Sequence, residues 1–272
     1  MKTHNLRLLV VALVLSIHGP AHAALSIFVD LPGVNGESNA PGRPDVTALD
    51  SLSIAPGKFD ATKLVDSTSP GLASAALSGT PYSSASLLFY DDLLSDAQPD
   101  AALVLNTAYV TGIQSVTLGS NPGEIASFSF ASPSLSMFLE LPGVAGEGSA
   151  PGHSGVIQVE SIALHANGFS IVKLVDSTST ALMTAALSGT PYATASLLFY
   201  ENILSESKPD FAVVYENALV SGFAVDSSQN VLKEDVSFAS EGVHIVPEPG
   251  VVALLAAALA GVILRRGRHA AV

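Results

Sequence analysis

Short runs of apolar residues, separated by polar and turn-forming residues, follow one another along most of the chain. In the first half these runs are rich in Val, Leu, Phe and Ser and are bounded by Pro, Gly, Asp or Asn, which is typical of β-strands. The predicted strands are 25–31, 46–54, 59–65, 85–90, 103–110, 111–118 and 124–130. Seven such strands in one unit predict a closed or nearly closed barrel, so the expected fold class is all-β dominated.

One segment between the third and fourth strands has the pattern of a helix instead. Ser69 is its predicted N-terminal cap, Pro70 lies in its first turn and Gly79 ends it. We expect one apolar stripe of this helix to pack on the barrel. The stripe consists of Leu72, Ala76 and Leu77.

The sequence repeats itself after 110 residues. The repeated motifs are LPGV (31–34 and 141–144), KLVDSTS (63–69 and 173–179), SGTPY (78–82 and 188–192) and SLLFY (86–90 and 196–200). A constant offset means that the two copies share one backbone plan. The sequence therefore predicts two barrels, each with one helix, at 24–131 and 135–246, joined by the short linker 132–134.

The N-terminus has the features of a secretory signal peptide. Lys2 and Arg7 precede the apolar run 8–17, and Ala21 and Ala23 supply the small residues that a signal peptidase needs before its cut. We expect residues 1–23 to be removed. The alternative is a membrane-spanning anchor, but the run is shorter than the roughly 20 residues that a bilayer requires.

The C-terminus, 247–272, combines a proline-rich start, an apolar segment at 251–264 and a basic tail at 265–268. The marking residues are Pro247, Glu248, Pro249, Arg265 and Arg266. This order resembles the PEP-CTERM sorting signal of Gram-negative bacteria. The resemblance implies a helix in the inner membrane with its arginines in the cytoplasm, and cleavage by an exosortase near 247–249. The alternative is a buried C-terminal helix of a soluble domain.

Composition excludes several classes of protein. With 48% hydrophobic residues the chain is too apolar for intrinsic disorder, and without cysteine it has no disulfides, Cys-ligated zinc or iron–sulfur cluster. All 24 Asp and Glu lie between Asp30 and Glu248, against six Lys and Arg in the same segment. Such an acidic segment does not favour binding to nucleic acid, which needs Lys and Arg at the phosphates.

Candidate catalytic chemistry is scarce. His153, His165 and His244 have no equivalent in the other copy, and no zinc-binding pair, phosphate loop or nucleophile elbow is present in the sequence. We therefore predict no catalytic residue, no metal and no cofactor. Lys63 with Asp66, repeated as Lys173 with Asp176, favours a helix-capping or surface ion pair over a lysine-assisted site.

Two further groups have alternative interpretations. Carboxylates gather in two equivalent loops, where calcium binding is the alternative to simple solvation. They are Asp91, Asp92, Asp96 and Asp100 in the first loop and Glu201, Glu206 and Asp210 in the second. Tyr82 and Tyr192 follow Pro in matching turns, where packing in a core or interface is favoured over stacking on a sugar.

The second copy, 135–245, resembles the haemolysin-coregulated protein (Hcp) family, the tube protein of type VI secretion. The motifs are LPGVAGEGSAPGHSGVIQVES (141–161), FSIVKLVDSTSTALMTAALSGTPYATASLLFYE (169–201), ALVSGF (218–223) and KEDVSFAS (233–240). The first copy, 25–131, resembles it more weakly. The resemblance implies two-sheet barrels with one helix, which assemble into hexameric rings that stack as a tube.

The chain departs from that family in carrying a signal peptide, a sorting tail and two barrels. It also has Arg43-Pro44-Asp45 where the second copy has His153-Ser154-Gly155 and the family usually has Gly-His. We therefore expect a non-enzymatic structural protein, exported by the general secretory route and located at the cell surface, outside the cell or in the periplasm. Inner-membrane anchoring would be transient.

The expected partners are signal peptidase, exosortase and further copies of the chain. Three chains with two barrels each would supply the six barrels of one ring. One alternative is a matrix protein that binds exopolysaccharide, and a second is a tube or effector-carrier component of type VI secretion.

Overall fold

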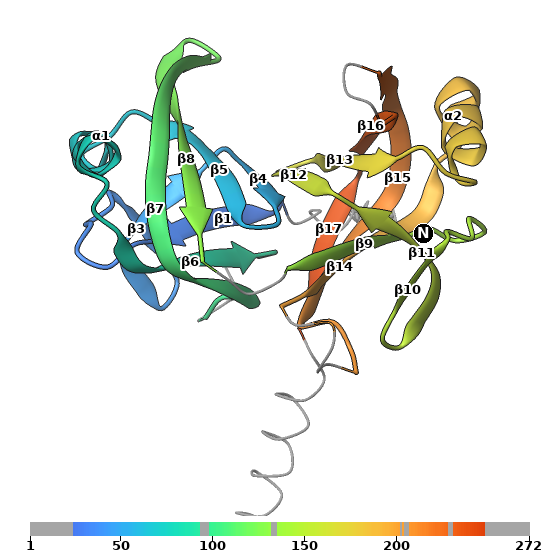
Figure 1. Ribbon diagram of the computed structural model, residues 1–272, viewed down its shortest axis with the longest axis horizontal. Helices are drawn as coiled ribbons and strands as arrows, with labels where there is room; N and C mark the ends of the chain where they lie inside the picture. Colours follow the sequence, from blue (N-terminus) through green and yellow to red (C-terminus); the bar gives the residue numbers. More distant parts are fainter. Residues whose placement is uncertain are drawn as a thin grey trace, which may run out of the picture.

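The computed structural model describes residues 24–92, 98–131, 135–201, 203, 207–227 and 231–247. Two β-barrel domains lie side by side in it, with one helix on the outer flank of each (Figure 1). The predicted signal peptide (1–23), the linker (132–134) and the apolar segment 251–264 lie outside the described residues. Among the described residues, no helix has the length and apolar character needed to cross a membrane.

Domain 1 contains eight strands and helix α1. Its elements are β1 (Ser26–Asp30), β2 (Ser38–Ala40), β3 (Arg43–Leu49), β4 (Ser51–Ala55), β5 (Lys58–Leu64), α1 (Ser69–Ser78), β6 (Tyr82–Tyr90), β7 (Ala101–Leu118) and β8 (Asn121–Phe130). Domain 2 repeats this order as β9 (Ser136–Glu140), β10 (Gly148–Ala150), β11 (His153–Val159), β12 (Ser161–His165), β13 (Gly168–Leu174), α2 (Ser179–Ser188), β14 (Tyr192–Tyr200), β15 (Phe211–Asp226) and β16 (Lys233–Ala239). It then adds β17 (Gly242–Pro247).

The two domains have the same antiparallel strand pairing. Domain 1 follows the order β4-β5-β8-β7-β6-β1-β3-β2, and domain 2 follows β12-β13-β16-β15-β14-β9-β11-β10. Strand β17 pairs with β15 in domain 2, and no described strand of domain 1 takes the equivalent place. The single backbone plan expected from the repeat is therefore present, with one added strand.

Several predicted strands differ from the structure. Strand β6 begins three residues earlier than predicted, β2 was not predicted, and two other segments are divided differently. The segments 103–110 and 111–118 form one long strand, β7, with a bulge between Val110 and Gly112. The segment 46–54 is instead two strands, because the backbone breaks at Asp50, whose N–H donates to the Thr62 carbonyl at 2.8 Å. A bulge bends a strand without ending it, whereas the segment 46–54 changes partner at Asp50, from β1 for β3 to β5 for β4.

Each helix ends where the sequence predicts. Gly79 adopts the left-handed conformation with φ 65°, and its N–H donates to the Ala75 carbonyl at 2.9 Å. Gly189 has the same geometry, as expected for glycine after a helix. The predicted cap is wrong, because Thr68 and Thr178 are the N-terminal caps and Ser69 is the first helical residue.

The predicted apolar stripe is correct only in part. Leu72 and Ala75 are buried against the barrel, and Ala76 is half-buried there. Leu77 is 91% exposed and its equivalent, Leu187, is 82% exposed. Five residues separate Leu72 from Leu77, and at about 100° per residue they point to different faces of the helix.

Candidate functional site

The two domains meet along strands β4 and β12, which pair as antiparallel neighbours. The pairs are Ile54 with Ile162, Ser53 with Ala163, Leu52 with Leu164 and Ser51 with His165. This pairing joins all 17 strands into one continuous sheet. We refer to β4, β12 and the groups that cross between the domains beside them as the interdomain seam.

The strands of the interdomain seam are equivalent copies of each other, related by the offset of 110 residues. The equivalent residues Ser53 and Ala163 face each other at the centre of the ladder. The pairing therefore has a local two-fold axis and is isologous, with the same edge used on both domains. Neighbours in a ring of six contact each other through two different surfaces, so these two domains are not arranged as adjacent members of such a ring.

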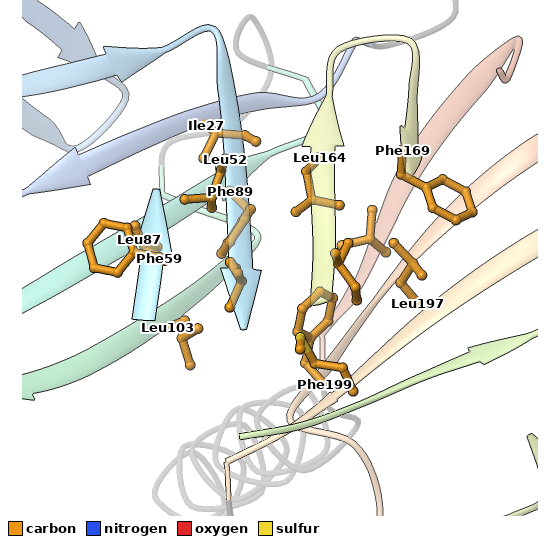
Figure 2. Close-up of a cluster of buried hydrophobic side chains, with 14 of the residues drawn as sticks. Ile27, Leu52, Phe59, Leu87, Phe89, Leu103, Leu164, Phe169, Leu197 and Phe199 are labelled. Atoms are coloured by element: carbon orange, nitrogen blue, oxygen red, sulfur yellow. The ribbon is translucent and has the colours of Figure 1, made fainter. Parts of the chain in front are cut away.

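Apolar side chains continue across the interdomain seam. Leu52 and Leu164 lie on the two central strands, with the aromatic residues of each barrel behind them (Figure 2). Phe211 of domain 2 stacks on Phe199 at a ring-centroid distance of 4.6 Å and also contacts Phe89 of domain 1 at 5.3 Å. All five side chains are buried in one hydrophobic cluster, so the domains share a core.

Two carboxylates cross the interdomain seam in opposite directions. Asp91 Oδ2, in domain 1, accepts the Ile245 N–H of β17 at 2.8 Å. Glu201, the equivalent residue in domain 2, accepts the N–H of Val104 in β7. Burial raises the pKa of Glu201, the nearby Asp210 charge raises it further, and the Val104 hydrogen bond acts against both. Each carboxylate thus satisfies a strand-edge donor of the other domain.

The remaining acidic residues brace these same loops. Asp100 Oδ2 accepts the Asp91 N–H at 3.0 Å, and Asp210 Oδ2 accepts the Glu201 N–H at 2.6 Å. Asp96 and Glu206 lie outside the described residues. Among the residues that the structure describes, in these loops and in the rest of the chain, no group of three acidic or histidine side chains is arranged to hold a metal ion.

A second candidate site lies under each helix. Lys63 Nζ contacts Asp66 Oδ1 at 2.7 Å and Glu124 Oε1 at 3.0 Å, and Ser69 Oγ donates to the same glutamate oxygen at 2.9 Å. Lys63 Nζ also donates to the Leu64 carbonyl at 2.9 Å. We call this group the first ion cluster.

The second ion cluster consists of Lys173, Asp176 and Glu234 in domain 2. Lys173 Nζ lies 2.7 Å from Asp176 Oδ1 and 3.3 Å from Glu234 Oε2. The Lys173 and Glu234 side chains are both 0% exposed, whereas Asp176 is 17% exposed. A cluster of this kind ties the start of α2 to strands β13 and β16.

The predicted pairs of Lys63 with Asp66 and of Lys173 with Asp176 form, but both lysines are buried rather than at the surface, and the two glutamates were missed. The signal was present in the alternation of strand residues, because Phe59, Ala61 and Lys63 point to the same face of β5. Glu124 likewise follows the inward alternation of Ala126 and Phe128 in β8. Charged residues at inward positions of two paired strands indicate a buried ion pair.

The aspartates of both clusters give stability a dependence on pH. Burial alone acts to raise the pKa of Asp66, but hydrogen bonds from Lys63 and Thr68 and the Lys63 charge outweigh it, so the pKa falls below 3.8. Asp176 has the same balance, with Lys173 and Thr178 as the donors. Because the folded-state pKa is the lower one, this stabilisation is complete above the unfolded-state pKa and is lost as pH falls through the folded-state pKa.

We expect the double variant Asp66→Asn, Asp176→Asn to flatten the acid limb of the stability curve. Urea unfolding between pH 7 and about pH 2 should show a smaller loss of stability for the variant than for the natural chain. The single variant Asp60→Asn, on the same strand as Lys63 but outside the clusters, is the control. Equal acid limbs for the natural chain and the double variant would contradict the assignment.

The other predicted residues have local partners. His153 Nδ1 lies 3.1 Å from Glu140 Oε2, and at the equivalent place Arg43 Nη1 lies 3.5 Å from Asp30 Oδ2. Arg43 and His153, which occupy equivalent positions in the two domains, thus both contact a carboxylate at the protein surface. On β17, His244 Nδ1 lies 3.7 Å from Glu216 Oε1.

The two tyrosines predicted to pack in a core or interface are half-buried. Tyr82 and Tyr192 begin β6 and β14, contact the hydrophobic cores, and have pKa values raised by burial. Tyr192 also lines a groove beside α2 with Pro142 and Thr184. Both tyrosines pack against the hydrophobic core, as predicted.

Of the predicted processing residues, only Pro247 is described. It is the last residue of β17 and pairs with Phe211 at the edge of the sheet. Ala21, Ala23, Glu248, Pro249, Arg265 and Arg266 lie outside the described residues. Their roles in cleavage and sorting remain predictions from the sequence.

Comparison with known proteins places domain 2 in a recognised class. Residues 138–245 match the family described as type VI secretion system effector, Hcp, so this domain is Hcp-like. No curated protein matches the chain.

Several solved structures are similar to part of the chain. Hcp1 from Salmonella typhimurium has 17% identity and a TM-score of 0.38, covering 43% of this chain and 89% of that one. A type VI secretion system effector from Yersinia pestis has 17% identity and a TM-score of 0.33, covering 40% and 96%. The secreted protein Hcp3 from Pseudomonas aeruginosa has 18% identity and a TM-score of 0.34, covering 42% and 92%.

Proposed function

We propose that the chain is a non-enzymatic structural protein that works by assembly of Hcp-like barrels outside the inner membrane. The observation that carries this proposal is the interdomain seam. Two barrels with one backbone plan associate through the same strand edge, with a shared core and reciprocal carboxylate contacts. Barrel-to-barrel contact is thus a property of the chain itself.

The sequence signals support the location. A signal peptide at 1–23 would direct export, and a sorting signal at 247–272 would hold the protein at the inner membrane until an exosortase cuts it. The last strand that the structure describes, β17, ends at Pro247, within the expected cleavage region 247–249.

The test is the native mass of residues 24–247, measured by native mass spectrometry across a range of concentrations, with calcium and without it. We expect complexes of two or more chains. A monomer at every concentration would contradict the proposal. Because the seam is isologous within the chain, these complexes must use surfaces other than β4 and β12, and the exposed Leu77 and Leu187 on the outer flanks are candidates.

The double variant Leu77→Ser, Leu187→Ser tests those flanks directly. It should lower the fraction of complexes without changing the unfolding midpoint, since both side chains are exposed. Val225→Ser, at a 56% exposed position on β15, is a control for a general loss of apolar surface. An unchanged oligomer distribution would remove the helices from the assembly surface.

A second candidate function is a tube or effector-carrier component of type VI secretion, which the family match of residues 138–245 favours. The two functions differ in the route of export. Deleting residues 2–23 should retain the protein in the cytoplasm if it leaves by the general secretory route. Continued export of the deletion variant, dependent on a secretion sheath, would favour the second function.

A further inference from the structure

The second ion cluster holds a primary amine against a carboxyl group in a place that water does not reach. Lys173 Nζ and Glu234 Oε2 are 3.3 Å apart, and both side chains are 0% exposed. The two residues are directly opposite each other in the ladder of β13 and β16. Because the fold holds the two groups next to each other, most of the entropy cost of bringing them together for a reaction has already been met.

One oxygen of this glutamate has no partner. Glu234 Oε1 is buried and makes no hydrogen bond, whereas the domain 1 equivalent, Glu124, is held through Oε1 by both Lys63 and Ser69. A buried polar atom without a hydrogen bond is costly to a folded protein. A reaction that expels this oxygen removes the cost.

We propose that Lys173 and Glu234 become joined by an intramolecular amide bond between Nζ and Cδ. The bond links β13 to β16 across adjacent strands and needs no change in their register. It gives a chain without cysteine a covalent cross-link inside the barrel of domain 2. The proposal does not depend on the proposed function.

The step needs no co-reactant. Glu234 takes one proton from the Lys173 ammonium group, which lies 3.3 Å from its Oε2, and the free amine then attacks Cδ. Asp176, whose Oδ1 lies 2.7 Å from Lys173 Nζ, takes a second proton from the nitrogen and returns it to the leaving oxygen. The Nζ–Cδ bond forms, the Cδ–Oε1 bond breaks, and Oε1 leaves as water with two protons that began on the ammonium group. The net change is one ammonium and one carboxylate converted to one amide and one water.

Asp176 is placed to serve as the base and proton carrier. Its Oδ1 accepts hydrogen bonds from the Thr178 N–H at 2.8 Å and from Thr178 Oγ1 at 2.6 Å, which fix the carboxylate beside the lysine. The carboxylate can therefore take a proton from Nζ and return it within the cluster, so the complete step neither takes up nor releases a proton.

The test is the intact mass of the full chain under denaturing conditions, which separates a covalent bond from an ion pair. We expect a mass lower than that of the sequence, after any processing is assigned, by one water molecule. Proteolysis should then yield a branched peptide that joins Lys173 to Glu234. The unchanged sequence mass, or a water loss that maps to other residues, would overturn the proposal.

Two variants refine the test. Lys173→Arg keeps the positive charge but provides no amine, so its mass should equal that of its sequence. Lys63→Arg makes the same change in the first ion cluster and should keep the loss of water at Lys173. Asp176→Asn should slow the reaction, and an unchanged yield would overturn the role given to Asp176.

Discussion

Replacing Lys63 by methionine is expected to lower the free energy of unfolding by about 3–5 kcal/mol. The substitution keeps most of the side-chain volume but leaves Asp66 and Glu124 without their cation in the buried first ion cluster. The loss comes from uncompensated buried charge, which is costly because the carboxylates have exchanged water for the protein interior. Urea unfolding at pH 7 measures it.

Lys233→Met is the matched control for this experiment. Lys233 lies on the same sheet, 2.7 Å from Glu160, but its side chain is 30% exposed. A solvent-screened pair of this kind contributes about 0–1 kcal/mol. Adding Glu124→Gln to the Lys63→Met variant should restore part of the stability, since it removes one of the orphaned charges. Equal losses for Lys63→Met and Lys233→Met would contradict the buried character of the first ion cluster.

Replacing Phe211 by alanine is expected to cost about 3–5 kcal/mol and to loosen the contact between the domains. Phe211 belongs to domain 2 but packs between Phe199 of its own domain and Phe89 of domain 1. Its removal opens a cavity at the interdomain seam. Chemical denaturation measures the loss, and hydrogen exchange of the β4 amides measures the loosening.

Phe138→Ala separates the two effects. Phe138 is a buried phenylalanine of domain 2 that contacts Tyr200, and it lies in a smaller cluster formed by domain 2 alone. Phe138→Ala should lower the free energy of unfolding by a similar amount. The hydrogen-exchange rate of the β4 amides should stay the same as in the natural chain. Equal acceleration of β4 exchange in both variants would show that the seam has no particular dependence on Phe211.

The repeat made most of the fold predictable from the sequence. Because the motifs recur at a constant offset, the two barrels, their helices and the helix ends at Gly79 and Gly189 follow from local patterns. The boundaries that failed depend on tertiary hydrogen bonds. The N–H of Asp50, between β3 and β4, donates to the Thr62 carbonyl. Ser69 is the first helical residue, and its hydroxyl donates to Glu124 instead of capping the helix.

The candidate sites were less accessible from the sequence. The inward alternation of Lys63 and Glu124 was readable, but their pairing depends on which strands are neighbours. The interdomain seam had almost no signal, since Leu52 and Leu164 look like ordinary core positions of two separate barrels. From the sequence alone, Asp91 and Glu201 are equally compatible with a solvated loop. Only the three-dimensional structure shows that they accept hydrogen bonds from β17 and β7.

The isologous seam has an evolutionary consequence, because its two halves are different segments of one chain and each has its own coding sequence. In a dimer of identical chains every substitution appears on both sides of the axis, and each contact of one residue with another is repeated in the opposite direction. Here Phe211 crosses toward Phe89, while the equivalent position in domain 1 is the small Ala101. Likewise only domain 2 carries the additional strand β17 among the described residues. Because the two halves are separate segments of one chain, each can change alone, and these two features make the contact resemble that of a heterodimer.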